Sequence, residues 1–470
     1  MLKSSRPLIA TALGDKQAGL IVESTHEERG AVLRKVFLIF LGAVAGAAVT
    51  LVTPLPRTVV EASSAKAAAE ALQQLRLFSN VFERVRSDYV EKPDDAKLIE
   101  AAIKGMLAGL DPHSRYLDAR SFRDVQVDTL GKFGGLGLEI ASENGRIKVI
   151  SAIDETPAAQ AGIIGGEIIT RIDDEPVDGL NVNEVAEKLR GPANTKVKLA
   201  IRRQYDDKLI EMVITRAIVR VISVRWHLED EDVGYVRISQ FNEQTTAGLK
   251  KAINDFKAKK GDKLKGFILD LRNNPGGLID QAITVANAFL KRGEILSTRG
   301  RGADGTQIFR AQPDKDISDG KPVIALINGG SASASEIVAG ALQDHKRATI
   351  VGTRSFGKGS VQTLIPLGRE SGALSLTTAR FFTPSGRSIQ AKGISPDIVV
   401  QQDIPEELRS SADATSEAGS RGHLLAEGQE ETGSQSYVPP DSKHDKTLKM
   451  ALDLLHGQVV NPSLPPNRDR

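Results

Sequence analysis

The stretch NGGSASASEIVAGALQD (residues 328–344), followed by GTRSFGKGSVQ (352–362), decides how this sequence folds. The apolar run PVIALIN (322–328) predicts a buried strand, and two glycines after it permit a sharp turn. A helix is expected to follow, from Glu336 to Asp344. A serine on such a turn presents its hydroxyl to solvent, and the amides of the nearby helix N-terminus favour a developing negative charge.

A serine also needs a base before it can act as a nucleophile. Without a base, Ser335 and Glu336 would only cap the helix, which is the alternative interpretation of this turn. Histidine is the commonest base, but His345 falls at the far end of the expected helix, and His113 follows a helix stop. Both histidines are therefore poorly placed, although the sequence leaves them open.

Lys358 is the better candidate base, because Gly357 and Gly359 flank it and let neighbouring backbone approach closely. To accept a proton the lysine must be neutral, whereas a free lysine has a pKa near ~10.4. Burial without a carboxylate partner would lower that pKa by up to about 3–5 pH units. Phe356 and Val361 provide an apolar setting that is compatible with burial. The alternative is a surface lysine in a Gly-Ser turn.

The segment DLRNNPGGL (270–278) contains a third polar turn, at the end of the expected buried strand GFILDLR (266–272). Gly276 and Gly277 could offer backbone N–H groups to an anion. The alternative is an ordinary turn that closes a strand, so this turn alone assigns no function.

The chain as a whole is predicted to be an α/β multidomain protein. Residues 58–130 are expected to be mostly helical, and 131–217 to form short strands with turns. Residues 218–401 alternate strand and helix, which indicates strands buried under helices. Residues 402–445 are rich in Ser, Glu, Gly and Gln and predict a disordered linker. The remaining residues, 446–470, are expected to form a short helix and a tail.

Composition excludes several classes of protein. The 62 basic and 60 acidic residues nearly cancel, which argues against a nucleic-acid binder, since such a protein shows a basic excess. The sequence has no cysteine, which excludes a thiol nucleophile, a disulfide framework and a cysteine zinc site. No cluster of metal ligands stands out either, so neither a metal nor an organic cofactor is expected.

The segment VFLIFLGAVAGAAVTLV (36–52) is uncharged and apolar, and Arg29, Arg34 and Lys35 precede it. This pattern predicts that everything after Pro54 lies outside the cytoplasmic membrane, in the periplasm or on the outer face of that same membrane. A buried core helix is the alternative. The segment could be a cleaved signal peptide or a retained single-pass anchor after a cytoplasmic stub, and a start codon assigned too early also stays open.

Taken together, these motifs resemble the carboxy-terminal processing peptidases, also called tail-specific proteases. The resemblance runs from about Phe78 to Val400. It rests on LDPHSRYL (110–117), GGLGLEI (134–140), GYVRISQF (234–241), DLRNNPGGL, SASASE, FGKGSVQ and FFTPSGRSIQAKGISPDIVV (381–400). The family implies an α/β protease core with crotonase-like β/α layers, a helical N-terminal region and an inserted PDZ domain over residues 131–217.

The resemblance also implies roles for single residues. The family has a serine–lysine dyad, and its pattern places the nucleophile on Ser333 and the base on Lys358. The family glutamine falls on Gln362, which can hydrogen-bond the lysine amine. The family oxyanion hole uses two backbone amides, here those of Ala334 and Gly277, with Gly276 as the alternative to Gly277.

The resemblance implies an endopeptidase that binds protein or peptide substrates with free C-termini and cuts exported proteins near those ends. GLGLEI (135–140) is predicted to be a strand, and the loop at its start would turn amides toward a terminal carboxylate. The loop residues are Gly135, Leu136, Gly137 and Leu138. A peptide-binding scaffold without catalysis and a Ser–His–Asp protease are the alternatives. An activating adaptor or lipoprotein and a homo-oligomer are further hypotheses, and whether the PDZ domain activates or inhibits stays open.

Overall fold

The structure is a computed structural model that describes residues 57–460, apart from gaps at 144, 154, 204–207, 303–304, 314–315, 369–370 and 407–415. The apolar segment 36–52 lies outside these residues, so export and anchoring stay predictions. Among the helices described, none is both long and apolar enough to cross a membrane. The chain divides into two units, Met1–Lys97 and Leu98–Arg470.

The first unit consists of a long helix and the start of a second one. The helix α2 (Arg57–Asp88) is followed by α3 (Asp95–Ala108), which begins in the first unit and ends in the second. Arg86, near the end of α2, donates a hydrogen bond of 2.9 Å to Asp95 at the start of α3. This contact holds the turn between the two helices.

The helical region predicted for residues 58–130 is largely confirmed. It ends in α4 (Ala119–Leu130), where the Asp118 side chain accepts from a free amide of the first turn. The strand β1 (Arg115–Leu117) interrupts this region. The interruption was not predicted, because β1 is stabilised by pairing with a strand far away in the sequence.

A six-stranded sheet forms the centre of the second unit. In sheet order its strands are β10 (Val224–Glu229), β11 (Val233–Ile238), β12 (Gly266–Asp270), β15 (Val323–Ile327), β16 (Ala348–Gly352) and β19 (Ile398–Val399). β10 pairs antiparallel with β11, and all other neighbours pair in parallel. Three of the four inner strands, β12, β15 and β16, are buried along their whole length, which explains their continuous apolar sequences.

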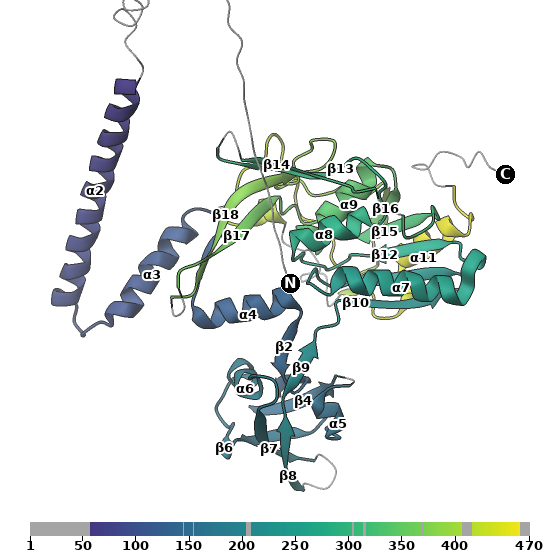
Figure 1. The fold of residues 1–470 in the computed structure, drawn as a ribbon, viewed down its shortest axis with the longest axis horizontal. Coiled ribbons are helices and arrows are strands. Elements are labelled where there is room, and N and C mark those ends of the chain that lie inside the picture. Colours follow the sequence, from purple (N-terminus) through teal and green to yellow (C-terminus); the bar gives the residue numbers. More distant parts are fainter. Residues whose placement is uncertain are drawn as a thin grey trace, which may run out of the picture. The chain divides into compact units, whose positions relative to one another are not determined.

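Helices cover both faces of this sheet (Figure 1). Phe267 and Leu269 of β12 point to one face and pack into a large apolar cluster, whereas Ile268 between them points to the other. The first face is covered by α7 (Thr245–Lys260), α8 (Ile279–Asn287) and α9 (Ala334–Asp344). The second face packs against α11 (Lys446–Leu455). The predicted α/β layers are therefore confirmed.

A second, antiparallel sheet was not identified from the sequence. Its order is β1, β18 (Ala373–Phe382), β13 (Glu294–Gly300) and β14 (Thr306–Arg310), and β17 (Ser360–Pro366) also pairs with β18. The second half of β17 is exposed, so its residues lack the continuous apolar pattern of the buried strands. This sheet carries the polar side chains that face the candidate site.

The inserted domain is a six-stranded antiparallel sheet with two helices. A ribbon of β2 (Lys132–Gly135) and β9 (Ala217–Arg220) leads the chain in and out of it. Its remaining elements are β3 (Leu138–Glu143), β4 (Arg146–Ala152), α5 (Pro157–Gln160), β5 (Ile168–Ile172), β6 (Glu175–Pro176), α6 (Val182–Leu189), β7 (Lys196–Arg202) and β8 (Leu209–Thr215). The prediction of one strand over 135–140 was wrong, because the chain breaks at Gly137, whose φ of 80° a strand does not accommodate.

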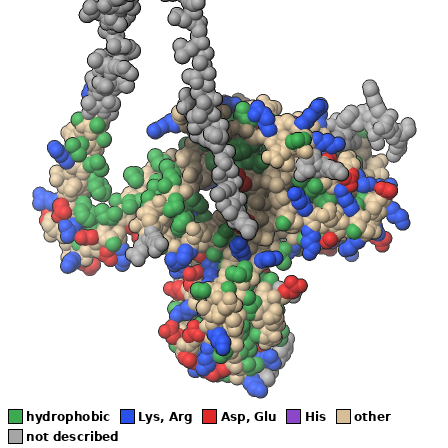
Figure 2. Space-filling model, viewed as in Figure 1, with side chains coloured by type: hydrophobic (Ala, Val, Ile, Leu, Met, Phe, Trp, Pro, Cys, Tyr) green, Lys and Arg blue, Asp and Glu red, His purple; other side chains and the backbone are tan. Residues whose placement is uncertain are grey.

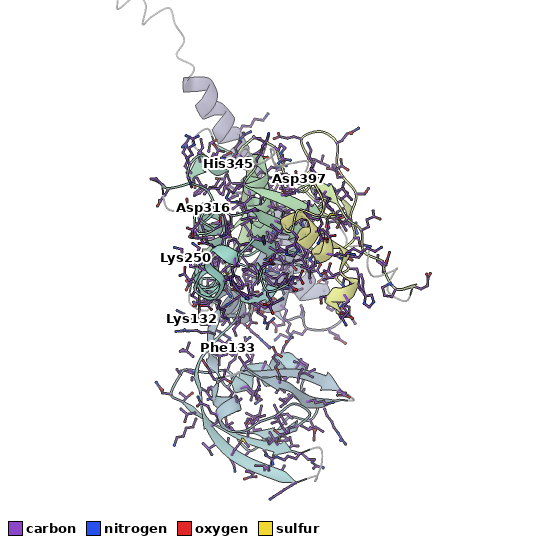
Figure 3. All side chains as sticks on the ribbon, turned by 90° about the vertical axis from the view of Figure 1, so that its right-hand side faces the viewer. Lys132, Phe133, Lys250, Asp316, His345 and Asp397 are labelled. Carbon is purple, nitrogen blue, oxygen red and sulfur yellow. The ribbon has the colours of Figure 1, made fainter. Side chains whose placement is uncertain are left out.

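Figure 3 shows Lys132 and Phe133 on the narrow connection between the core and the inserted domain. Figure 2 shows basic and acidic side chains side by side over this domain on the face in view. The mixture agrees with the near balance of charges in the sequence.

The prediction of a disordered linker over 402–445 was wrong for the residues that the structure describes. Residues 416–436, which we call the strap, lie against the loops around the candidate site. Glu417 is fully buried, the Gly329 amide donates to the Gln435 carbonyl, and Arg354 pairs with Glu431. Composition failed here because the strap is held by polar contacts and not by apolar burial.

The predicted C-terminal helix is confirmed as α11, and a buried ion pair anchors it. Arg272, from the DLRNNPGGL turn, donates to both carboxylate oxygens of Asp445, at 2.7 and 2.9 Å. Asp445 also caps the first turn of α11 by accepting from the Leu448 amide. The other side of the Arg272 guanidinium binds Asp270 at the end of β12. The turn at 270–278 is thus held from both the sheet and the C-terminal helix.

Candidate active site

Ser333, the candidate nucleophile, lies on the turn between β15 and α9. Its backbone has φ 53° and ψ −112°, a combination that residues other than glycine rarely adopt. The helix begins at Ala334, earlier than the predicted start at Glu336. The turn therefore places the Ser333 side chain directly at the N-terminus of α9, where it is 9% exposed and lines a cleft.

The three serines of SASAS make different contacts. The Ser331 hydroxyl donates to the Leu271 carbonyl at 2.8 Å, and the Ser335 hydroxyl donates to the Asn274 carbonyl at 2.9 Å. Both side chains are fully buried. The Ser333 hydroxyl, in contrast, donates to none of the described residues, and its oxygen only faces the Glu336 amide in the capping box of α9. Only the middle serine is therefore free to react, whereas its neighbours fasten the nucleophile turn to the DLRNNPGGL turn.

Glu336 joins the two candidate catalytic loops. Its side chain is fully buried, and each carboxylate oxygen accepts two hydrogen bonds. Oε2 accepts from the backbone amides of Ser333 (2.7 Å) and Lys358 (2.9 Å). Oε1 accepts from the Gly357 amide (2.7 Å) and the Ser355 hydroxyl (2.5 Å). Burial raises the pKa of Glu336 to about 7, against the opposing effect of these four donors.

Lys358 lies on the loop before β17, where the expected close approach of backbone is present. A Cβ added to Gly359 would lie 2.4 Å from a backbone nitrogen of the facing segment, so no other residue fits there. Burial lowers the pKa of Lys358, as expected. Three carboxylates, Glu417, Glu336 and Asp111, act in the opposite direction, and the Arg115 charge lowers the pKa further. The lysine therefore has the expected burial but does not lack carboxylate neighbours.

Gln362 does not make the hydrogen bond to the lysine amine that the family resemblance implies. Its side-chain NH₂ group donates instead to the hydroxyls of Ser360 (3.0 Å) and Thr377 (3.1 Å). Its carbonyl oxygen accepts from no residue that the structure describes. Since Gln362 and Lys358 line the same cleft, that oxygen is available to an approaching amine.

The two glycines of the DLRNNPGGL turn differ in their backbone contacts. The Gly276 N–H donates to the Asn274 side chain at 2.9 Å. The N–H groups of Gly277 and Ala334 donate to no acceptor within the described part of the chain. A Cβ added to Gly276 would lie 2.8 Å from the Ser333 Cβ, so this turn packs directly against the candidate nucleophile.

The candidate side chains share one cleft of about 550 Å³. Ser333, Lys358, Gln362 and both glycines line it, whereas the Ala334 side chain is buried beneath. No hydrogen bond joins the Ser333 hydroxyl to the Lys358 amine, although both residues are described. The site thus has a hydroxyl that donates to no described residue, a buried amine and two free backbone amides, one of which is at the N-terminus of α9. Acyl transfer requires groups of these kinds.

Comparison with known proteins assigns the family. The chain matches peptidase family S41 over residues 232–400. A carboxy-terminal-processing protease from Bartonella bacilliformis is 52% identical over 401 residues, covering 85% of this chain and 92% of that protein. This chain belongs to the carboxy-terminal processing proteases. Carboxy-terminal processing protease CtpA of Bacillus subtilis is 34% identical over 394 residues, covering 83% and 82% of the two chains.

Further matches concern single regions of this protease. Residues 149–203 match the PDZ domain, and residues 47–121 match the N-terminal domain of the activating protease CtpB. The solved structure of a photosystem II D1 C-terminal processing protease is 29% identical and covers 74% of this chain and 97% of that one, with a TM-score of 0.40. The two family matches confirm the predicted PDZ domain and protease core.

The histidines that the structure describes lie elsewhere. His345 ends α9, about 16 Å from the helix start at 1.5 Å per residue. Figure 3 shows it at the outer edge of the core near Asp316, and its ring binds the Glu294 carbonyl. His113 pairs with Glu417 at 2.8 Å. No histidine of the described residues lines the cleft, so the structure gives no support to a histidine base.

The GLGL loop of the PDZ domain has free backbone donors. Gly135 ends β2 and Leu138 begins β3, so the loop proper is Leu136 and Gly137. Their carbonyls accept from the amides of Ala158 and Ile153, but their own amides donate to no described residue. Two adjacent free amides are what a terminal carboxylate requires.

Sequence reasoning missed the residues that hold Gln362 in place. Asp111 accepts from the hydroxyls of Ser114 (2.7 Å) and Thr377 (3.1 Å). Thr377 in turn accepts from the Gln362 amide. The DPHS part of LDPHSRYL therefore positions Gln362, a residue of the cleft, through Thr377. The polar spacing Asp-x-x-Ser was the only sequence signal that could have indicated this role.

Proposed function

We propose that this protease is a serine endopeptidase in which Ser333 attacks the peptide carbonyl and Lys358 is the general base. The observation that carries this proposal is the contrast within SASAS: the middle hydroxyl is free and faces a cleft, while its neighbours are buried and bonded. Burial lowers the pKa of the lysine that lines the same cleft, which favours the neutral amine a base requires.

In the proposed reaction, Lys358 accepts the hydroxyl proton as Ser333 Oγ bonds to the carbonyl carbon. The oxyanion of the tetrahedral intermediate accepts from the free N–H groups of Ala334 and Gly277. Lys358 then gives its proton to the leaving amine, and an acyl-enzyme remains. Water attacks this ester with the same lysine as base, which releases the new C-terminus and restores the serine. We prefer Gly277 over Gly276 because the Gly276 amide is already bonded.

The proposal needs one movement. Since the serine hydroxyl and the lysine amine are not hydrogen-bonded here, the lysine side chain has to approach Ser333 before attack. Gln362 could direct it, because the glutamine carbonyl oxygen is free and lies in the same cleft. An apo site commonly tightens only when substrate binds, so this geometry is compatible with a resting enzyme.

We propose that the substrates are exported proteins cut near their C-termini. The free amides of the GLGL loop support recognition of a terminal carboxylate by the PDZ domain. The apolar segment 36–52 supports a location in the periplasm or on the outer face of the cytoplasmic membrane. Whether the segment is cleaved is best decided by N-terminal sequencing of the mature protein.

Partners other than substrates follow from the N-terminal region. The match to the CtpB N-terminal domain supports an activating adaptor or lipoprotein, or self-association, as a hypothesis. Leu75, Phe78 and Val81 of α2 are exposed within the first unit and would offer apolar contacts to such a partner. Light scattering on the purified protease would detect a homo-oligomer.

A serine-directed fluorophosphonate probe tests the dyad without knowledge of the substrate. We expect wild-type protein to be labelled, and we expect Ser333→Ala and Lys358→Ala to be unlabelled while keeping the thermal unfolding midpoint within a few degrees. A catalytically silent peptide-binding scaffold would not react in any form. Labelling of Ser333→Ala on another serine would reject the assignment of the nucleophile.

A further inference from the structure

The strap brings a buried carboxylate to the back of the candidate site. Glu417 has no exposed surface, and its two oxygens have different partners. One accepts from the Gln390 side chain at 2.8 Å, and the other pairs with the His113 ring at 2.8 Å. The strap itself is polar and reaches the core from the C-terminal end of the chain, so Glu417 is an unusual residue to bury.

Glu417 is hydrogen-bonded, directly or through one other residue, to the loop on both sides of Lys358. Its backbone amide donates to the carbonyl of Phe356, at 3.1 Å. On the other side, the Gly359 amide donates to Gln390 at 3.1 Å, and the same glutamine donates to Glu417. The loop that carries the lysine is therefore held on both sides of Lys358. Phe356 bonds to Glu417 directly, and Gly359 bonds to it through Gln390.

A structural role alone does not explain why this residue is charged. A glutamine at 417 could accept from Gln390 and meet His113 with the same number of hydrogen bonds. A fully buried carboxylate instead carries a desolvation cost, which is justified where the charge itself has an effect. Besides the His113 ring that pairs with it, the carboxylate can influence the charged Lys358 amine, since the loop contacts hold the two residues near each other.

The other charged groups around these residues are known. Lys358 is acted on by Glu336 from α9, Asp111 from the loop before β1 and Arg115 from β1. Among the carboxylates, Glu417 has the largest effect, and it raises the pKa of Lys358. Glu417 itself faces His113, and its charge also acts on His423 in the strap.

We propose that Glu417 is a positioning residue through which the strap holds the Lys358 loop and favours the protonated, resting form of the lysine amine. The inference rests on the proposed role of Lys358 as the base. It follows that the strap sets the pH at which the protease becomes active. Loss of the Glu417 charge should make the lysine easier to deprotonate and shift the alkaline rise in activity toward lower pH.

The test measures the rate of fluorophosphonate labelling of Ser333 against pH in the full chain. For Glu417→Gln we expect the rise to move to lower pH by about half to one pH unit, which is about 3–10-fold faster labelling below the rise. Glu431→Gln is the matched control: it removes a strap carboxylate that pairs with Arg354 at a more exposed position. This control should leave the rise at the wild-type pH.

The position of the rise does not depend on the fraction of active protein, so partial misfolding of Glu417→Gln does not obscure the result. If that variant does not fold, the double variant His113→Phe/Glu417→Leu replaces the buried pair with apolar side chains, a change that often preserves stability. It should show the same shift.

The outcomes separate the two proposals. An unmoved rise, or a rise at higher pH, in Glu417→Gln together with loss of labelling in Lys358→Ala overturns the inference and leaves the dyad intact. Persistent labelling of Lys358→Ala with a wild-type pH profile instead overturns the proposed function, whatever Glu417→Gln does.

Discussion

Glu336→Ala removes the carboxylate that holds both candidate catalytic loops. The substitution leaves four buried donors without an acceptor: the amides of Ser333, Gly357 and Lys358, and the Ser355 hydroxyl. Each unsatisfied buried donor costs about 1–3 kcal/mol, so the four together cost about 4–12 kcal/mol. A typical domain has a free energy of unfolding of about 5–15 kcal/mol. We therefore expect Glu336→Ala to unfold or to open the turn, and to have no activity.

Glu336→Gln is the informative substitution. The amide oxygen can take the place of Oε2 and keep the Ser333 and Lys358 amides bonded. The NH₂ group then faces Ser355, whose hydroxyl can accept, and the Gly357 amide, which cannot. One backbone contact is lost, at a cost of about 1–3 kcal/mol. If this loss acts fully on the transition state, the rate falls about 5–150-fold.

The same substitution removes a buried charge, which acts on stability in the opposite direction. The pKa of Glu336 is raised from 4.5 to about 7 in the folded state. The stability contribution of such a group is full below the unfolded pKa and is lost as the pH rises through the folded pKa. Above pH 7 the ionised form therefore costs about 3 kcal/mol, which a neutral glutamine avoids. We expect Glu336→Gln to be about as stable as wild type at pH 8 and relatively less stable at pH 5.

Thermal unfolding at pH 5 and pH 8, together with labelling kinetics at pH 8, provides the assay. Glu336 does not line the cleft, so KM for a reporter peptide should stay near the wild-type value while kcat falls. Wild-type kcat in Glu336→Gln would refute the claim that this carboxylate organises the loops. So would a folded Glu336→Ala with normal stability.

Three further predictions concern the turns and the PDZ loop. Ser331→Ala and Ser335→Ala should each lower the unfolding midpoint yet keep activity within about tenfold of wild type. Ser335→Ala loses one buried hydrogen bond, and Ser331→Ala loses at least two, from the Asn328 amide and to the Leu271 carbonyl, at about 1 kcal/mol each. A dead Ser331→Ala would contradict the choice of Ser333. Gly276→Ala should lose at least 100-fold in labelling rate, since its φ is 105° and its new Cβ would lie 2.8 Å from the Ser333 Cβ. The control Gly302→Ala should be labelled normally, because its new Cβ would have no atom within 4 Å. A peptide with a free C-terminal carboxylate should bind full-length Ser333→Ala at least about tenfold more tightly than the same peptide with a C-terminal amide, because charge-assisted hydrogen bonds contribute about 1.5–3 kcal/mol each. Fluorescence anisotropy measures both affinities, and equal affinities would reject carboxylate recognition.

The sequence was sufficient for elements whose signal is local. The run PVIALIN became β15 because a strand buried on both faces needs a continuous apolar sequence. The glycines around Lys358 were correctly interpreted as sites of close backbone approach, since only glycine tolerates the contact seen at Gly359. The choice of Ser333 within SASAS came from family resemblance, and no property of the isolated sequence separates it from Ser331 and Ser335.

Contacts between distant segments could not be predicted. Glu336 was interpreted only as a helix-capping residue, because its partners on the Lys358 loop are adjacent in space but not in sequence. The strap was predicted to be disordered, because composition counts apolar residues and cannot show that Glu417 is paired with His113, 304 positions away. Antiparallel sheets built from half-exposed strands, such as β17 with β18, have the same difficulty.

The placement of donors suggests where regulation acts on this protease. The backbone of both loops is already fixed, since the amides of Ser333 and Lys358 share one oxygen of Glu336. The lysine side chain, in contrast, is not fixed in its catalytic position. Its amine has no hydrogen bond to the serine, and neighbouring carboxylates raise its pKa against the effect of burial. Under the proposed mechanism, activation then needs only a reorientation and a deprotonation of the Lys358 side chain, a small change compared with assembling a loop. A tail bound in the PDZ domain could supply that change at low energetic cost, and a slow loop-closing step in labelling kinetics would argue against this order of events.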